Sequence, residues 1–141
     1  MTLAECIADP ACFGGAFDTD ARPKRAVLRL YLALWRLLGL GLGMAQGAAQ
    51  FCRRYAFEAL GGYEERLFMG EDVDFYWRLK RLVRMKGKRT VFLRDVRVVP
   101  SSRRFDSWPL WKTLLWTNPV IVGLLGRRKS AWGGWHEAPP R

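Results

Sequence analysis

The sequence predicts one α/β domain, in which short apolar strands alternate with amphipathic helices. The chain has 141 residues, of which 50% are hydrophobic and 26% are charged. This composition supports one modest core and excludes a disordered tail or an ordinary multi-span membrane protein. The clearest helix lies between Gly70 and Gly87, with acids in its first turn and bases near its end, as the helix dipole favours. Its apolar side chains share one face at helical spacing: they are Phe75, Leu79, Leu82 and Val83.

The first third of the chain predicts a helix, a strand and a second helix. Residues 2–9 should form a helix that Pro10 stops, and residues 11–17 a strand whose glycines allow a close approach of another backbone. Residues 18–24 are a polar connection. Residues 25–39 predict a helix, and its following glycines should break it into a loop: these are Gly39, Gly41 and Gly43.

The elements around the clearest helix are shorter. Residues 46–52 predict a strand, and residues 53–60 predict a helix that Gly61 ends in a left-handed conformation. Residues 90–93 and 96–99 predict two further strands, because β-branched and other apolar residues dominate them.

The charge of the chain predicts an anionic partner. Lys and Arg number 24 against 13 Asp and Glu, which gives a net charge of +11 and a pI near 10.3. Nucleic acid, an acidic membrane surface and a phosphate-bearing substrate are the three classes of partner that such a charge favours. A basic face that is simply solvated is the alternative for any single Lys or Arg.

Residues 107–141 form a Trp-rich, basic region that we expect to associate with a membrane surface. The apolar stretch 109–126 is interrupted by Pro119 and predicts two short helices that lie in an interface or in a core. The basic cluster 127–129 follows directly, as a juxtamembrane cluster does. The helix at 25–39 is too short and too charged to span a bilayer, and both an interfacial position and a core position remain open for it.

Cysteine and histidine do not predict a metal site. Cys6, Cys12 and Cys52 have no metal-type spacing, and their small, odd number favours reduced thiols and a cytoplasmic location. His136 is the only histidine, and a solvated side chain is the favoured interpretation over a metal ligand. The N-terminus lacks the pattern of a signal peptide.

The best candidate for a chemical site is a carboxylate cluster at a helix start. Glu71, Asp72 and Asp74 fall there, while residues 78–104 carry eleven Lys and Arg and one acid, Asp95. A carboxylate base beside cations that hold phosphate is suited to moving a group off a phosphate leaving group. The alternative is an acidic helix cap without chemistry.

The run GAAQFCRRYAFEALGGYEERLFMGEDVDF, residues 47–75, resembles the second half of family-two glycosyltransferases. That family has a small-residue strand, an Arg-Arg-x-x-Phe helix, a Gly-Gly turn, an acidic loop and a Glu-Asp pair opening a helix, in this order. The resemblance extends over about residues 2–106, through Ser101-Ser102-Arg103-Arg104. It divides the chain into an acceptor-side part, residues 1–106, and the membrane-associated region 107–141.

The resemblance implies a partial GT-A-like mixed sheet with flanking helices, and sugar transfer from a nucleotide-sugar to a hydroxyl with inversion. Asp72 would be the base that deprotonates the acceptor, and Glu71 would orient it. The diphosphate and substrate contacts would come from Gln50, Asp74, Arg103 and Arg104. Members of the family use a divalent metal, Mn or Mg, held by an Asp-x-Asp motif in a nucleotide-binding half.

That nucleotide-binding half has no counterpart in this sequence. The letters Asp18-Thr19-Asp20 follow the glycine-rich strand, whereas the family's metal motif precedes it, so we interpret them as a loop. We therefore expect no firmly bound metal in this chain alone, and the chain reads as a fragment or as one part of a two-chain enzyme. A sheet edge left open by the absent half should favour a homodimer.

A non-catalytic basic module, bound to a membrane surface or to nucleic acid, is the alternative function. The sequence shows no helix-turn-helix, zinc-finger or RNP pattern, so nucleic acid is the less favoured partner. The expected partners are thus a nucleotide-sugar donor, a hydroxyl acceptor of a lipid-linked or other kind, and the inner membrane face, where the protein would be peripheral.

Overall fold

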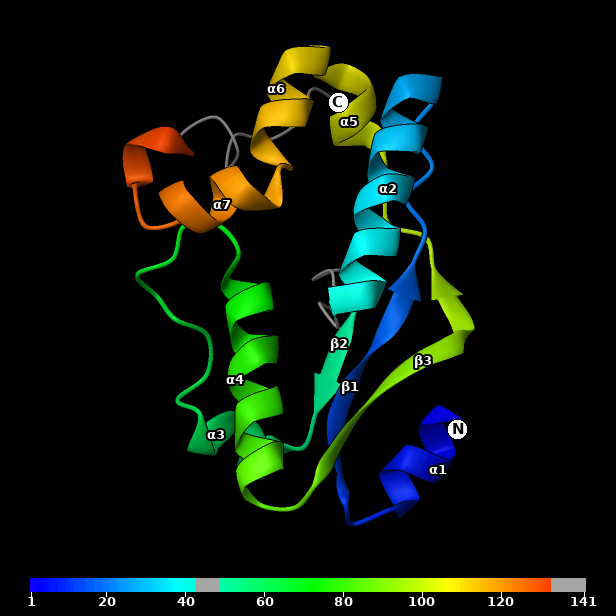
Figure 1. Ribbon diagram of the computed structural model, residues 1–141, viewed down its shortest axis with the longest axis vertical. Coiled ribbons are helices and arrows are strands. Elements are labelled where there is room, and N and C mark those ends of the chain that lie inside the picture. Colours follow the sequence, from blue (N-terminus) through cyan, green and yellow to red (C-terminus); the bar gives the residue numbers. More distant parts are fainter. Residues whose placement is uncertain (43–48, 133–141) are drawn as a thin grey trace.

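A three-stranded mixed sheet forms the centre of the molecule (Figure 1). The computed structural model describes residues 1–42 and 49–132. In the sheet, β1 (Cys12–Thr19) lies between β2 (Gln50–Cys52), which is antiparallel to it, and β3 (Arg89–Val98), which is parallel. The predicted α/β class, with a mixed sheet and flanking helices, is confirmed.

The strand β3 replaces the two strands predicted over residues 90–99. It runs unbroken from Arg89 to Val98, and a register shift against β1 falls between Phe17 and Asp18. The shift falls beside Arg94 and Asp95, which lie between the two predicted strands. Among the described strands β3 is an edge strand.

Two glycines let the backbones of the sheet approach closely. A Cβ atom on Gly14 would lie 2.4 Å from the Phe51 carbonyl oxygen, and one on Gly15 would lie 2.2 Å from the Val91 carbonyl oxygen. No side chain fits at such distances, so the glycines of the central strand are required by packing on both neighbouring strands.

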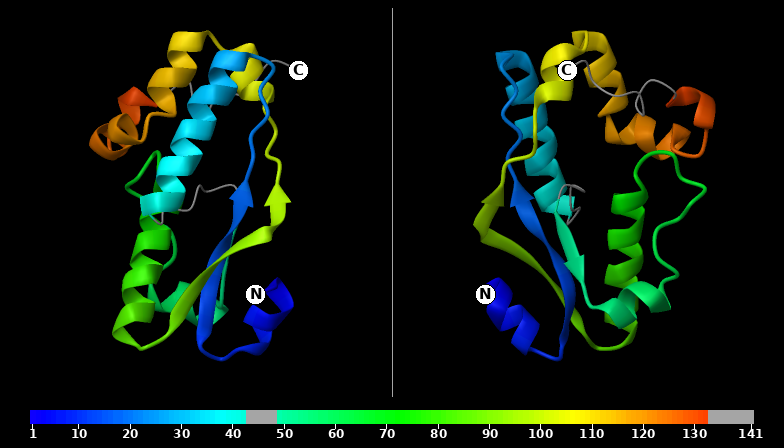
Figure 2. Two further views of the ribbon diagram at one scale, coloured as in Figure 1. Left: turned by 45° about the vertical axis from the view of Figure 1, so that its right-hand side comes forward. Right: turned by 180° about the vertical axis from the view of Figure 1, so that it is seen from behind.

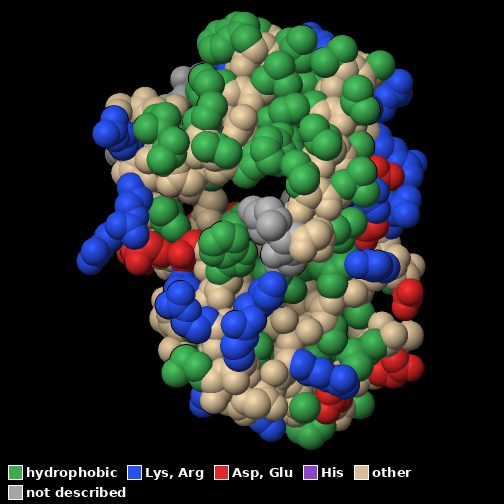
Figure 3. Space-filling view, viewed as in Figure 1, with side chains coloured by type: hydrophobic (Ala, Val, Ile, Leu, Met, Phe, Trp, Pro, Cys, Tyr) green, Lys and Arg blue, Asp and Glu red, His purple; other side chains and the backbone are tan. Residues whose placement is uncertain are grey.

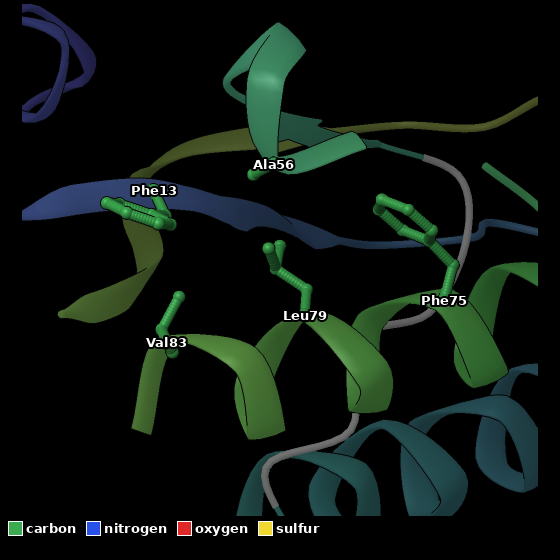
Figure 4. Packing of buried hydrophobic residues seen from close by; sticks show 5 residues of the cluster. All are labelled: Phe13, Ala56, Phe75, Leu79 and Val83. Atoms are coloured by element: carbon green, nitrogen blue, oxygen red, sulfur yellow. The ribbon is translucent and has the colours of Figure 1, made fainter. Parts of the chain in front are cut away.

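The helix α4 (Glu71–Met85) covers the sheet and supplies three of the five residues of the main buried cluster (Figure 4). Its apolar stripe faces Phe13 of β1 and Ala56 of the short helix α3 (Arg54–Ala59). The stripe residues Phe75, Leu79 and Val83 are each less than 5% exposed. The 3.6-residue periodicity of the sequence therefore predicted this element correctly.

The helix α2 (Ala26–Leu42) is longer than predicted, because Gly39 and Gly41 lie inside it. Gly43 lies outside the described residues, as do residues 46–48 of the predicted second strand. In Figure 1 the lower end of α2 lies in front of the upper end of the sheet, and Leu28 of this helix is completely buried. The side chain of Arg36 also anchors it to β1 by an ion pair with Asp18.

The interpretation of residues 18–20 as a loop was wrong for two of the three. Asp18 and Thr19 end β1, are buried, and pair with Arg97 and Val98 of β3 in register. The backbone N–H of Asp20 also donates to the carbonyl of Val98, at 2.9 Å. Strand pairing thus continues past the apolar run from which the end of the strand was predicted.

The C-terminal region forms three helices at one end of the molecule (Figure 2). The helices α6 (Leu110–Trp116) and α7 (Pro119–Leu125) confirm the prediction of two short helices separated before Pro119. Before them, α5 (Arg103–Ser107) was not predicted, and the 3₁₀ turn η1 (Lys129–Ala131) follows them. Asn118 caps α7 by accepting from the N–H of Val120, at 2.9 Å.

No described helix has the length and apolar character needed to cross a bilayer.

The N-terminal helix α1 (Leu3–Ala8) packs beside the opposite end of the sheet. Thr2 and Glu5 form a capping box at its start. Cys6 of this helix forms a disulfide with Cys12 of β1, and Cys52 is a free thiol. The expectation of three reduced cysteines was therefore wrong for this pair, because residues six apart meet when the chain turns at Pro10.

Candidate functional site

The candidate site lies at the N-terminus of α4, where three carboxylates share the first turn. Gly70 precedes the helix in the left-handed conformation, with φ of 80°, which places Glu71, Asp72 and Asp74 in that turn. A Cβ atom on Gly70 would lie 2.9 Å from Cγ1 of Val122 in α7. Both the backbone angle and the space therefore require glycine before the acids.

The side chain of Gln50 ties β2 to this turn. Its Nε2 donates a hydrogen bond of 3.1 Å to the backbone carbonyl of Asp72. Its Oε1 is buried and has no hydrogen-bond partner among the described residues. A buried amide oxygen without a hydrogen bond costs stability, so the role that we assign to Gln50 is positioning of the turn.

Asp72 itself is half-buried, and its carboxylate lies close to the helix backbone. Oδ1 accepts a hydrogen bond of 2.8 Å from the N–H of Val73. The positive end of the helix dipole favours negative charge at this position, and a general base needs a charged carboxylate. The neighbouring Glu71 is exposed to solvent.

Asp74, predicted to contact substrate, lies in the same turn but has a structural partner. Its Oδ2 pairs with Nε of Arg78, at 2.7 Å. The two terminal nitrogens of Arg78 then donate to the carbonyls of Leu60 and Gly62, at 2.8 and 2.9 Å. The pair thus fixes the Gly-Gly turn against α4, and the substrate contact of Asp74 stays a prediction.

Tyr63 packs beside the start of α4, and the sequence analysis did not identify it. Its ring packs against those of Phe57 and Phe75, with centroids 5.7 and 5.1 Å apart. Partial burial raises the pKa of the Tyr63 phenol above its ordinary value, and the negative charges of Cys52, Asp72 and Glu71 raise it further. The phenol is therefore affected by the charges of these carboxylates. In the sequence, the position of this aromatic residue directly after the Gly-Gly turn could have indicated it.

Arg103 and Arg104 lie on α5, which Figures 1 and 2 show beside the N-terminal end of α2, with α6 and α7 between it and the start of α4. Nε of Arg103 donates to Oγ of Ser101, at 3.2 Å, and the guanidinium of Arg104 lies 5.5 Å from the centre of the Trp108 ring. Their part in holding a diphosphate remains a prediction.

A second group of charged side chains surrounds Asp18, away from α4. Asp18 accepts from Nε of Arg36, at 2.8 Å, and lies 3.4 Å from Nε of Arg97. Hydrogen bonding to Arg36 lowers the pKa of the Asp18 carboxyl below its ordinary value, against the opposing effect of burial. With two guanidinium groups so close, the carboxylate serves an ion-pair network.

The described residues contain no group of three or more His, Cys, Asp or Glu side chains placed to hold a metal ion. His136 lies outside them. The carboxylates at the start of α4 are therefore not part of a metal-binding group among the described residues.

Comparisons with protein-family models, with curated proteins and with solved structures give no significant match to this chain. The geometry of the residues at the start of α4 is therefore the basis for a functional assignment.

Proposed function

We propose that the chain is the acceptor-side part of a glycosyltransferase that moves a sugar from a nucleotide-sugar to a hydroxyl with inversion. The observation that carries this proposal is the position of Asp72, in the first turn of α4 and hydrogen-bonded through its backbone to Gln50 of β2. The resemblance of residues 47–75 to family-two enzymes supports it, and the GT-A-like arrangement of the sheet belongs to the same proposal.

The chemistry follows from the charge of the carboxylate. Asp72 accepts the proton of the acceptor hydroxyl as its oxygen attacks the anomeric carbon, and the bond from that carbon to the nucleoside diphosphate breaks. Glu71 is exposed beside Asp72 and orients the acceptor. Gln50 is a positioning residue, since its contact is to the backbone of Asp72. A divalent metal, Mn or Mg, would assist departure of the diphosphate, and the described residues supply no complete set of ligands for it.

Titration calorimetry with UDP- and GDP-sugars, with and without Mn²⁺, tests donor binding, and release of nucleoside diphosphate in the presence of hydroxyl acceptors tests transfer. Asp72→Asn should abolish transfer and leave binding unchanged. Asp95→Asn is the matched control, because it removes an exposed carboxylate from β3 and should change neither. Transfer by the Asp72→Asn protein at the wild-type rate would refute the proposed role of the base.

A further inference from the structure

The outward side of α2 carries a stripe of large apolar side chains. Their spacing of three and four residues places them on one face of the helix, opposite the buried Leu28. A stripe of this kind normally faces a core, yet these side chains are 44–75% exposed. They are Val27, Leu30, Leu34, Leu37 and Leu38.

The helices α6 and α7 extend this stripe into one surface. The hydroxyl of Tyr31 donates to the carbonyl of Leu114, at 3.0 Å, and Arg25 donates to the carbonyl of Trp108, at 2.9 Å, so α2 is fixed to the C-terminal region. We call the α2 stripe and the exposed apolar residues of α6 and α7 the apolar surface. The latter are Leu110, Trp111, Leu115, Val120 and Leu124.

Figure 3 shows hydrophobic side chains gathered over the part of the molecule where these three helices lie, with Lys and Arg at its edges. Isolated exposed apolar residues need no explanation, but ten of them on three adjoining helices indicate a surface that is covered in use. The remaining question is what covers it.

The charges of the segments that build the apolar surface decide between its possible occupants. Residues 21–42 and 107–132 together contain nine Lys and Arg and no Asp or Glu. A second copy of the chain, docked through the same surface, would place like charges opposite one another. An anionic bilayer supplies both the apolar interior and the negative charge that the two segments lack.

We infer that the apolar surface binds the interface of an anionic lipid bilayer, with α2, α6 and α7 lying against the membrane. The indole of Trp111 is 66% exposed, and indole favours the headgroup level of a bilayer. Arg127 and Arg128, which follow α7 directly and are exposed, reach the lipid phosphates. Binding of this kind needs no spanning helix, and it does not depend on the transfer reaction proposed for Asp72.

Vesicle sedimentation tests the inference. The wild-type protein should sediment with vesicles of phosphatidylcholine and phosphatidylglycerol, and much less with phosphatidylcholine alone. Leu30→Ser with Leu37→Ser removes two exposed leucines of the surface and should weaken binding roughly tenfold or more. Ile7→Ser with Met85→Ser is the matched control, because these residues are similarly exposed on α1 and at the end of α4, and should bind as wild type.

Circular dichroism and thermal unfolding establish that both double variants are folded. Equal binding of the two double variants would overturn the inference, as would wild-type protein that stays in the supernatant. A wild-type dimer in sedimentation velocity that becomes monomeric in the Leu30→Ser, Leu37→Ser protein would also overturn it, by assigning the surface to a second copy of the chain. Loss of transfer in the Asp72→Asn protein, with vesicle binding intact, would show that membrane binding by the apolar surface does not depend on the proposed transfer reaction.

Discussion

The side-chain amide of Gln50 donates to the backbone carbonyl of Asp72 over 3.1 Å. A residue at the start of an edge strand thereby holds the first turn of α4 from outside the helix. This contact is not a helix cap, because a capping side chain accepts from a backbone N–H whereas Gln50 donates to a carbonyl; Gly70, the residue before the helix, has no side chain for a cap. The contact ties the backbone of Asp72 to β2, and its removal should first loosen the backbone of this turn.

Substituting Gln50 by Met should separate positioning from stability. The change removes the hydrogen bond to Asp72, and it also removes a buried Oε1 that has no partner among the described residues. These effects oppose each other, so the free energy of unfolding should change by less than about 1 kcal/mol. The amide of Asp74, which donates to Gly70 at 3.0 Å, should exchange faster with solvent because the turn is held less firmly.

Denaturant unfolding and amide hydrogen exchange measure the two quantities. A fall in stability of more than about 2 kcal/mol, with unchanged exchange at Asp74, would mean that Gln50 supports the fold and does not position the turn.

Substituting Arg78 by Met should destabilise the protein clearly. Arg78 joins Asp74 to the carbonyls of Leu60 and Gly62, so its loss leaves three half-buried acceptors without this donor. Charge-assisted hydrogen bonds are stronger than neutral ones, and we expect a loss of about 2 kcal/mol in the free energy of unfolding. Urea unfolding measures it. Arg81→Met is the control on the exposed side of the same helix, and an equal loss there would exclude the clamp as the cause.

The sequence was informative about the fold wherever periodicity and turn chemistry agreed. The stripe of α4 and the left-handed Gly61, with φ of 71°, were both predicted from local pattern. The predicted break at Gly39 and Gly41 was wrong because glycine lowers helix propensity by only about 1 kcal/mol, which packing readily offsets. The end of β1 was misplaced because strand pairing, which local sequence does not contain, extends this strand over Asp18 and Thr19. The break predicted within β3 is a register shift against β1 in a continuous strand.

The candidate site was predictable only in part. The acids of the first turn were found because they precede an amphipathic helix. The pairing of Asp74 with Arg78 was missed although its spacing of four residues on a helix was available in the sequence. The contacts of Arg78 with carbonyls 16 and 18 residues away could not be predicted, because they depend on the fold. Tyr63 was missed because its contact with Phe75 of α4 depends on how the acidic loop folds back on that helix.

Acid should remove the stabilising effect of Asp18. Hydrogen bonding to Arg36 holds the pKa of the folded Asp18 carboxyl below its ordinary 3.8. A depressed folded pKa contributes stability that is complete above the unfolded pKa and is lost as the pH falls through the folded pKa. Asp18→Asn should therefore lower the free energy of unfolding by about 1–3 kcal/mol at pH 7 and at pH 5, and by less at pH 3.

Urea unfolding of both proteins at the three pH values measures this difference. Other acids also titrate in this range, Asp9 among them, and the comparison with the variant cancels their contribution because both proteins carry them. A difference that is as large at pH 3 as at pH 7 would show that Asp18 acts through its shape and not its charge.

Substituting Gly15 by Ala should disrupt the sheet itself. The added Cβ would lie 2.2 Å from the Val91 carbonyl oxygen and 3.0 Å from Cζ of Phe51, so β3 would have to move away from β1. Overpacking against backbone is not relieved by a change of rotamer, and we expect a loss of at least about 3 kcal/mol in the free energy of unfolding, or failure to fold. Gly123→Ala in α7 is the control, because a Cβ there meets nothing within 4 Å. Thermal and urea unfolding of the two variants measure the contrast, and a Gly15→Ala protein as stable as the Gly123→Ala protein would contradict the close pairing of β1 with β3.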